Sequence, residues 1–471
     1  MKKHNQLTIY ISMGVFLALF LSMIIYLCVF VHQNETVLIN NNYNSRQETL
    51  LARNTRGSIY SADGDVLAQT IVSEDGTEKR NYPYGDLFAH IVGYATKGRM
   101  GVESLANYYL INSDLPVSSK VANDVAGQKN PGNNVYTTLN VELQKIADEY
   151  LNVYRGAVIV TEVKTGRILV MLSHPDFDPG SIDEDWESLV NDEESSVLVN
   201  RATQGLYPPG STFKILTALE YYRQNRKTLD DYSFTCNGRF RYNEEQISCY
   251  HGISHGEVDL RMSFAKSCNS SFANIGMSLD RDSFGKSLTG LLFLQELPTD
   301  LLTSESTVIM NDDISDFEMM QTSIGQGKTT MTPMHLNMIT TAIANDGVLM
   351  RPYVLDRVLN AEGDLIKTFS SENEGRLMSK EEAAYLTDLM IDVVEEGTGT
   401  KLSGQDYTAA GKTGSAEYND MKGDSHAWFT GFAPAEDPEI AVTIIIEGAG
   451  SGGDYAVPLA KRIFDAYFAE E

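Results

Sequence analysis

The chain has 471 residues, of which 37 are basic and 64 acidic, so its formal net charge is −27 at pH 7. This balance argues against a nucleic-acid-binding surface, which requires clustered positive charge. Four cysteines in this length are too few for a disulfide scaffold, and the length allows two or three domains.

The N-terminal segment predicts a membrane anchor. Residues 7–31 contain no charged side chain, and at about 1.5 Å per residue a helix of this length exceeds the roughly 30 Å hydrocarbon core of a bilayer. Lys2 and Lys3 precede it, which predicts a cytoplasmic tail at residues 1–6 and an extracellular body. A cleaved signal peptide is the alternative, but the apolar run is long for one and no small-x-small cleavage site follows.

Residues 32–150 predict a small folded pedestal that holds the next domain away from the membrane. Two short strands are expected on either side of the turn at residues 62–65, and helices are expected from Gly101 and over residues 139–147. No cluster of paired carboxylates indicates a polymerising domain in this segment.

The residue pattern becomes rich in β-branched and other apolar residues after Arg155, where a main sheet is predicted to begin. Residues 156–162 and 167–172 are β-rich runs separated by a Lys-Thr-Gly turn, which predicts a hairpin. Acidic residues crowd with Pro and Ser between Asp176 and Glu194, which predicts a solvated loop.

The stretch Tyr207-Pro208-Pro209-Gly210-Ser211-Thr212-Phe213-Lys214 is the first candidate for chemistry. Its prolines and glycine predict an open segment that enters a helix, with Lys214 one turn after Ser211 on the same face. A serine hydroxyl attacks poorly without a base within hydrogen-bond reach, and a desolvated lysine can be that base. For an isolated Ser-x-x-Lys, a helix cap followed by a solvated lysine is the commoner explanation.

Two further short motifs follow. Ser267-Cys268-Asn269, after a helix-like run over residues 258–266, offers a hydroxyl that can relay a proton and an amide that can hold a carbonyl. In residues 410–417 (AGKTGSAE), small side chains allow a ligand backbone to lie against a strand edge, while Lys412 supplies charge for a carboxylate. Either motif alone is also a common turn.

The three motifs in this order are typical of penicillin-binding proteins and class A β-lactamases. The neighbouring residues agree with that pattern: Tyr207-Pro208-Pro209-Gly210, Ile324-Gly325-Gln326-Gly327 with Thr332-Pro333, and Ala427-Trp428-Phe429-Thr430-Gly431-Phe432. The chain resembles a class B penicillin-binding protein, a monofunctional peptidoglycan D,D-transpeptidase, from the anchor to the C-terminus.

The resemblance implies an α+β fold. A transpeptidase domain over residues 151–471 should contain a five-stranded antiparallel sheet covered by helices, with a strand at residues 439–447 and a final helix at about residues 456–468. The Glu-x-x-Leu-Asn element with which class A β-lactamases activate water is not found between the second and third motifs. Its absence favours transpeptidation over antibiotic hydrolysis.

The resemblance also implies a role for each motif residue. Ser211 would attack the carbonyl between two D-alanines, Lys214 would take its proton, and Ser267 with Lys412 would pass a proton to the departing D-alanine. The implied substrate-binding residues are Asn269 for an amide, Lys412, Thr413 and Ser415 for the terminal carboxylate, Gly414 between them, and the backbone N–H groups of Ser211 and Ser415 for the oxyanion.

The implied partners are peptidoglycan stem peptides, β-lactams and a SEDS-class glycan polymerase in the membrane, and the chemistry needs no cofactor. A D,D-carboxypeptidase or endopeptidase shares the catalytic set, differs only in the acceptor, and stays an alternative. A membrane β-lactam sensor is a second alternative. Sensors of that type have several transmembrane helices and a cytoplasmic effector, whereas this sequence predicts one span and a short cytoplasmic tail.

The remaining candidates are soft metal ligands. Cys236, Cys249, His255 and Cys268 are suited to a structural zinc, but their spacing is far wider than a Cys-x-x-Cys knuckle. Some elongation-type relatives carry a zinc ligand in the middle of the second motif, where this chain has Cys268. A Cys236–Cys249 disulfide and buried free thiols are the alternatives, and His251 is an alternative to His255.

Overall fold

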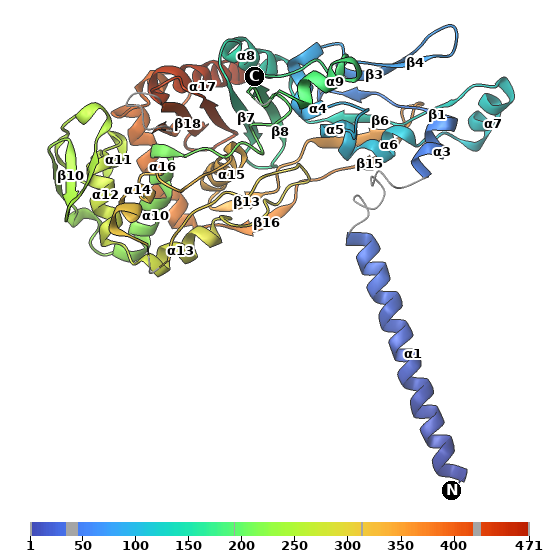
Figure 1. Ribbon diagram of the computed structural model, residues 1–471, viewed down its shortest axis with the longest axis horizontal. Helices are drawn as coiled ribbons and strands as arrows, with labels where there is room; N and C mark the ends of the chain where they lie inside the picture. Colours follow the sequence, from blue (N-terminus) through green and yellow to red (C-terminus); the bar gives the residue numbers. More distant parts are fainter. Residues whose placement is uncertain (1, 34–45, 193, 312–313, 418–424, 470–471) are drawn as a thin grey trace.

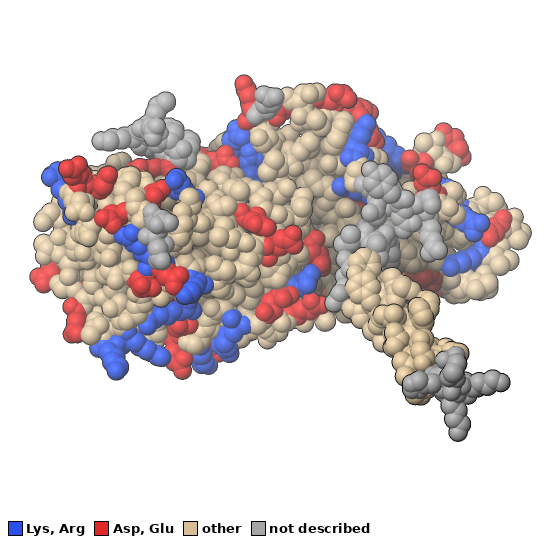
Figure 2. Space-filling view, turned by 60° about the horizontal axis from the view of Figure 1, so that its bottom comes forward, with Lys and Arg blue, Asp and Glu red and all other residues tan. Residues whose placement is uncertain are grey.

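The computed structural model describes residues 2–33, 46–192, 194–311, 314–417 and 425–469. Helix α1 (Lys2–Gln33) contains the apolar segment Leu7–Val31, of mean hydropathy 2.7, and none of that segment is buried by the rest of the chain. Figure 2 shows it as a projecting, charge-free surface. Within the described residues it is the one helix long and apolar enough to cross a membrane.

A small α/β unit follows α1 in the sequence (Figure 1). Its elements are α3 (Arg46–Arg53), β1 (Asn54–Thr55), β2 (Ile59–Tyr60), β3 (Val66–Val72), β4 (Glu78–Asn81), α4 (Ala89–Val92), α5 (Gly101–Leu105), α6 (Asn107–Ile111), α7 (Val117–Ala126), β5 (Asn130–Pro131), β6 (Asn134–Thr137) and α8 (Val141–Leu151). Strands β2 and β3 are antiparallel about the predicted turn, and helices lie where they were expected.

The sheet of this unit includes strands from much later in the chain. Its order is β15-β14-β6-β2-β3-β4, where β14 is Leu355–Leu359 and β15 is Leu365–Thr368. Strand β14 pairs with β6 in an antiparallel ladder. The pedestal therefore contains a hairpin from within the region assigned from sequence to the transpeptidase domain, and the division at residue 150 stays a prediction.

The second sheet is the predicted five-stranded antiparallel sheet. Its order is β17-β18-β19-β7-β8, with β7 at Gly156–Glu162, β8 at Ile168–His174, β17 at Ala410–Glu417, β18 at Ser425–Ala433 and β19 at Ile440–Ile446. Every residue of β8, β18 and β19 is buried, because helices cover both faces.

Side chains of alternate residues on these strands enter two different cores. On one face, Val158, Phe429 and Ile444 pack against α8 and the C-terminal helix α17 (Gly452–Ala469). On the other, Ile159, Trp428 and Ile445 face the core that contains α15 (Pro333–Ala344). The expected final helix is confirmed and begins earlier than residue 456.

The remaining elements are α9 (Ile182–Val190), α10 (Lys214–Asn225), β9 (Phe234–Cys236), β10 (Arg239–Tyr242), β11 (Glu245–Ser248), β12 (Gly256–Val258), α11 (Leu260–Ala265), α12 (Asn269–Ser278), α13 (Arg281–Gly290), α14 (Asp316–Thr322), β13 (Val348–Met350), β16 (Asn373–Arg376) and α16 (Lys380–Glu395), with short 3₁₀ turns between them. Helices α10 to α14 form a mostly helical lobe beside the sheet, whereas α9 lies on the pedestal side (Figure 1).

The loop predicted between Asp176 and Glu194 is wrong, because α9 lies within it. Three acidic residues fill the first turn of that helix, where they interact favourably with the positive end of its dipole. Ile182 is buried, and Trp186 packs edge-on against Tyr94. The acidic run therefore forms the first turn of a helix that docks on the pedestal side.

Candidate active site

Ser211 lies on a tight turn that leads into α10. Residues Gly210–Phe213 form a 3₁₀ turn, and α10 begins at Lys214, so the predicted helix entry is confirmed. Gly210 has φ +54°, and its N–H donates to the carbonyl of Gly325 at 2.9 Å. A left-handed backbone next to a crowded neighbour requires glycine, which explains the residue before Ser211.

The Lys214 amine contacts side chains from both of the first two motifs. Its Nζ lies 3.0 Å from Ser211 Oγ, 3.2 Å from Ser267 Oγ and 2.6 Å from Asn269 Oδ1. It also donates to the Ser267 carbonyl at 2.8 Å. Residues 53 and 55 positions apart in sequence from Lys214 therefore converge on one nitrogen.

Burial sets the charge state of this amine. Lys214 is fully buried, and desolvation lowers the pKa of its ammonium from 10.5 to about 7. Within the described residues its Nζ contacts two hydroxyls, a backbone carbonyl and an amide oxygen, and forms no ion pair with a carboxylate. An amine that is substantially neutral at physiological pH, 3.0 Å from a serine hydroxyl, can accept the proton of that hydroxyl.

The second motif turns sharply between α11 and α12. Ser267 has φ +56°, and Cys268 caps α12 by accepting the N–H of Ser271 at its sulfur. The left-handed residue directs both the Ser267 carbonyl and its hydroxyl toward Lys214. The Asn269 Nδ2 donates to the Ser248 carbonyl at 3.1 Å, which fixes the orientation of this amide.

The third motif lies on β17, the edge strand of the main sheet. Lys412 is fully buried, and its Nζ donates to Ser267 Oγ at 3.0 Å and to the Thr413 carbonyl at 3.1 Å. Burial, together with the charge of Lys214, holds the pKa of Lys412 well below its usual value. Ser267 Oγ thus lies between two lysine amines.

The strand continues past the nucleophile turn. Thr413 hydrogen-bonds to Thr398 through its hydroxyl, and a Cβ on Gly414 would lie 3.0 Å from Trp428 Cβ and 3.1 Å from Thr212 Cγ2. Any larger residue at this position would force these neighbours to shift, so glycine favours the close approach of β17 to the turn. Ser415 is partly exposed and follows at the open edge.

A brace behind the turn was not predicted from the sequence. The Tyr207 hydroxyl donates to Glu447 Oε1 at 2.7 Å, and Arg201 Nε donates to the same oxygen at 2.8 Å. The Trp428 indole donates to the Pro208 carbonyl at 3.1 Å. These contacts tie the Tyr-Pro-Pro-Gly segment to β18 and to the end of β19, and no short motif signals them.

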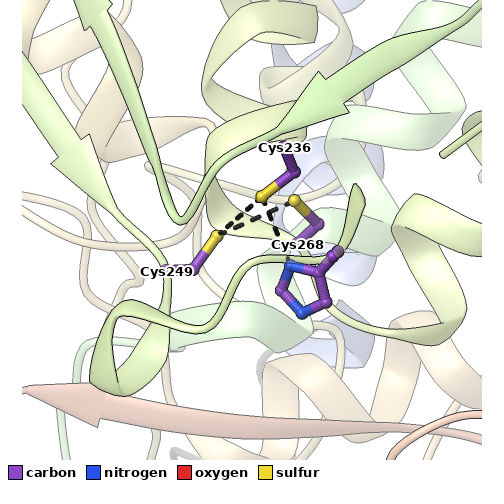
Figure 3. A group of neighbouring side chains, drawn as sticks. Cys236, Cys249 and Cys268 are labelled. Carbon is purple, nitrogen blue, oxygen red and sulfur yellow. Dashed lines mark hydrogen bonds between the residues drawn. The ribbon is translucent and has the colours of Figure 1, made fainter. Parts of the chain in front are cut away.

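Four soft ligands meet beside the second motif (Figure 3). The Sγ atoms of Cys236 and Cys249 are 3.7 Å apart, those of Cys249 and Cys268 are 3.8 Å apart, and Cys236 Sγ is 3.4 Å from His255 Nδ1. All four ligand atoms lie within 4.8 Å of one another. The predicted set is therefore assembled, with His255 rather than the exposed His251.

The thiols are not cross-linked, since all four cysteines of the chain are free. A sulfur separation of 3.7 Å is far longer than the roughly 2.05 Å of a disulfide, so the disulfide alternative does not describe this structure. Hydrogen bonding from the Cys268 thiol lowers the pKa of Cys249 to about 3, and the same contact raises the pKa of Cys268.

Comparison with known proteins places this geometry in a family. The family model described as penicillin binding protein transpeptidase domain matches residues 156–465, which is more than half of the chain. The chain is a class B penicillin-binding protein. A second model, described as penicillin binding protein A dimerisation domain, matches residues 56–135.

Individual relatives agree with this membership. The chain is 32% identical over 445 residues to peptidoglycan D,D-transpeptidase PbpA of Mycolicibacterium smegmatis, covering 88% of this chain and 89% of that protein. It is 30% identical to peptidoglycan D,D-transpeptidase MrdA of Acinetobacter baumannii, covering 82% of this chain and 65% of that protein.

Solved structures show the same fold. The imipenem acyl-enzyme complex of penicillin-binding protein A from M. tuberculosis matches with a TM-score of 0.80 and 28% identity, covering 88% of this chain and 99% of that one. A D,D-transpeptidase domain from Eggerthella lenta matches with a TM-score of 0.79 and 31% identity, covering 88% and 99% of the two chains.

Proposed function

We propose that Ser211 is the nucleophile with which this peptidoglycan D,D-transpeptidase forms its acyl-enzyme, and that β-lactams acylate the same oxygen. The observation that carries this assignment is the 3.0 Å contact between Lys214 Nζ and Ser211 Oγ, made by a buried amine. The acyl-enzyme complexes of M. tuberculosis penicillin-binding protein A support it by analogy.

The acylation step uses Lys214 as the general base. The neutral amine accepts the Ser211 proton while Oγ forms a bond to the carbonyl carbon between the two D-alanines of the donor stem. The bond to the terminal D-alanine nitrogen then breaks, and that nitrogen takes a proton. Proton transfers by positioned groups typically contribute about 10² to 10⁴ in rate.

Ser267 is the proton relay to the leaving amine. Its hydroxyl contacts both lysine amines, at 3.2 Å from Lys214 and 3.0 Å from Lys412, so it can pass a proton without moving far. An acceptor amine from a neighbouring stem then attacks the acyl-enzyme and reverses the proton path. The result is a crosslink, and Ser211 is regenerated.

Donor binding is assigned to the second and third motifs. Asn269 holds a donor amide, Lys412 with the Thr413 and Ser415 hydroxyls holds the terminal carboxylate, and Gly414 keeps the strand flat against the nucleophile turn. The backbone N–H groups of Ser211 and Ser415 form the oxyanion hole, where loss of a donor costs on the order of 3 kcal/mol.

Labelling with a fluorescent penicillin tests the nucleophile. The wild type should give a covalent band on a denaturing gel, and Ser211→Ala should give none while retaining its thermal melting temperature. Ser263→Ala, at a buried serine whose hydroxyl donates to the Asp259 carbonyl and makes no hydrogen bond to Lys214, is the control and should keep the band. Labelling of Ser211→Ala at the wild-type rate would reject the assignment.

A donor thioester tests the balance between transfer and hydrolysis. Incubated with the donor and a D-amino acid acceptor, the protein should release an exchanged peptide. Formation of hydrolysed product alone would instead indicate a D,D-carboxypeptidase.

The membrane arrangement is part of the proposal. Residues 1–6 lie in the cytoplasm, residues 7–31 span the membrane, residues 32–150 form the core of the pedestal, and residues 151–471 carry the extracellular catalytic domain. A SEDS-class glycan polymerase docks on the anchor and pedestal and supplies the glycan strands. Copurification with such a polymerase should survive Ser211→Ala and be lost when residues 7–31 are exchanged for an unrelated span.

We also propose that the Cys₃His cluster holds a structural zinc ion. Around an ion with Zn–S bonds of about 2.3 Å, tetrahedral geometry separates sulfurs by about 3.8 Å, and the observed separations are 3.7 and 3.8 Å. Thiolates and a neutral imidazole are the ligands that zinc prefers. Since Cys268 lies between Ser267 and Asn269, the ion would stiffen the second motif.

Metal analysis of the folded, unreduced protein tests the zinc proposal. About one zinc per chain is expected, and Cys249→Ser should lose it together with thermal stability. Cys28→Ser, a change in the apolar N-terminal helix, is the matched control and should keep the metal. A wild-type protein without zinc but with three reactive thiols in its extracellular part would contradict the proposal.

A further inference from the structure

The free edge of β17 offers backbone groups to a donor peptide. β17 pairs with β18 on one side only, and residues alternate along it between that partner and the open edge. The Ser415 carbonyl oxygen faces the nucleophile turn, lying 3.0 Å from the position of a Cβ on Gly210. Thr413 and Glu417, two residues to either side, therefore direct their backbone groups to the same edge.

Two of these three edge positions are already in use. The Thr413 carbonyl accepts from Lys412 Nζ at 3.1 Å. At Glu417, the side-chain amide of Gln326 binds both backbone groups, with the amide oriented so that donors meet acceptors. Its nitrogen then donates to the Glu417 carbonyl at 3.1 Å, and its oxygen accepts from the Glu417 N–H at 3.1 Å. Of these three positions, Ser415 is therefore the one at which neither backbone group has a partner among the described residues.

The backbone that carries Gln326 is locked to the nucleophile turn. Gly325 has φ +72°, its carbonyl accepts from the N–H of Gly210, and a Cβ at Gly325 would lie 2.1 Å from the Gly210 carbonyl oxygen. The Ile-Gly-Gln-Gly segment thus spans from the turn that holds Ser211 to the far end of the edge strand. There the side-chain amide of Gln326 makes the two hydrogen bonds that the backbone of a neighbouring strand residue would make.

We propose that Gln326 is a specificity-determining residue that limits strand pairing between β17 and the donor. The inference rests on the proposed function, because the terminal carboxylate at Lys412 and Thr413 sets the direction in which the donor runs. Residues that precede the attacked carbonyl then run antiparallel to β17, from Ser415 toward Glu417. Gln326 occupies the Glu417 position, so the enzyme pairs with the D-Ala-D-Ala end and leaves the preceding stem residues unpaired.

Donor length tests this inference. Gln326→Leu, which keeps the size of the side chain and removes its amide, should raise kcat/KM for a full pentapeptide donor relative to a short acyl-D-Ala-D-Ala donor by about three- to tenfold, the worth of one net backbone hydrogen bond. Gln326→Ala should change the ratio in the same direction. Gln405→Leu, at a partly exposed glutamine on another loop, is the control and should leave the ratio unchanged.

The assay uses the full-length protein in detergent and includes labelling of Ser211 by a fluorescent penicillin. If both Gln326 variants label normally and their donor ratio is unchanged or falls, the inference is overturned while the proposed function stands. If wild-type Ser211 is not labelled, the proposed function itself fails. A raised ratio with normal labelling supports both.

Discussion

The Oδ1 of Asn269 lies 2.6 Å from Nζ of Lys214, the shortest of the four hydrogen bonds that this amine makes. A carboxylate at that position would stabilise the ammonium form. Asn269→Asp should therefore raise the pKa of Lys214 and slow acylation at pH 7 by about tenfold or more. Acylation rates across pH check this, with exposed Asn152→Asp as the control.

The wild-type acylation rate should rise with pH through about 7, where Lys214 loses its proton. The sign follows from the role of the amine, because only its neutral form can accept the Ser211 proton. Below that pH the rate should fall about tenfold per unit. A flat profile between pH 5.5 and 8 would show that Lys214 is not the base in the rate-determining step.

Glu103 should be a strong determinant of stability. Its side chain is 0% exposed and pairs with Arg56 at 2.6 Å and with Arg80 at 2.7 Å. Burial would raise its pKa, but the two guanidinium charges outweigh that effect and lower it. Glu103→Gln leaves two nearly buried cations uncompensated and should cost about 3–5 kcal/mol in denaturant unfolding.

The exposed pair Glu142–Lys145 is the control for Glu103. Its side chains are 64% and 41% exposed at 2.7 Å, so Glu142→Gln should change the free energy of unfolding by less than about 1 kcal/mol. Equal losses in the two variants would contradict the assignment of a buried charge network.

Gly325→Ala should disrupt the nucleophile turn. The added Cβ would lie 2.1 Å from the Gly210 carbonyl oxygen, and the residue has φ +72°. Gly363→Ala separates the two effects, because Gly363 has φ +93° but nothing within 4 Å of its Cβ position. We expect about 1–2 kcal/mol lost at Gly363, and a larger loss with much slower penicillin labelling at Gly325.

The brace behind the turn predicts non-additivity. Tyr207→Phe removes the hydroxyl that donates to Glu447 at 2.7 Å and should cost about 1–3 kcal/mol of stability. In combination with Glu447→Ala, which removes the accepting oxygen, the loss should be smaller than the sum of the single losses, since both changes remove the same contact. Additive losses in a double-mutant cycle would show that the two side chains are not coupled.

The catalytic motifs were predictable because each is short and local, and their order indicates a known family. Their convergence on Lys214 depends on the fold, in particular on the left-handed backbone at Ser267. Cys236 and Cys268 were recognised as candidate ligands from residue type, but only the pairing of β9 with β12 brings Cys236 toward His255.

Other features could not be predicted from local patterns. The contact between Tyr207 and Glu447 joins residues 240 positions apart. The hairpin of β14 and β15 joins a sheet whose remaining strands, β6, β2, β3 and β4, lie far earlier in the chain. The helix α9 was missed because its acidic residues indicate solvent, although the same charges favour a helix N-terminus.

The return of β14 to the pedestal sheet has a mechanical consequence. Because β14 is hydrogen-bonded to β6, the pedestal and the transpeptidase domain cannot move apart as two independently tethered domains without breaking that ladder. The chain leaves β15 for β16 and then α16, and α16 packs against β17. A torque applied to the pedestal sheet therefore has a stiff route, through hydrogen-bonded backbone and the packed helix α16, to the strand that carries Lys412.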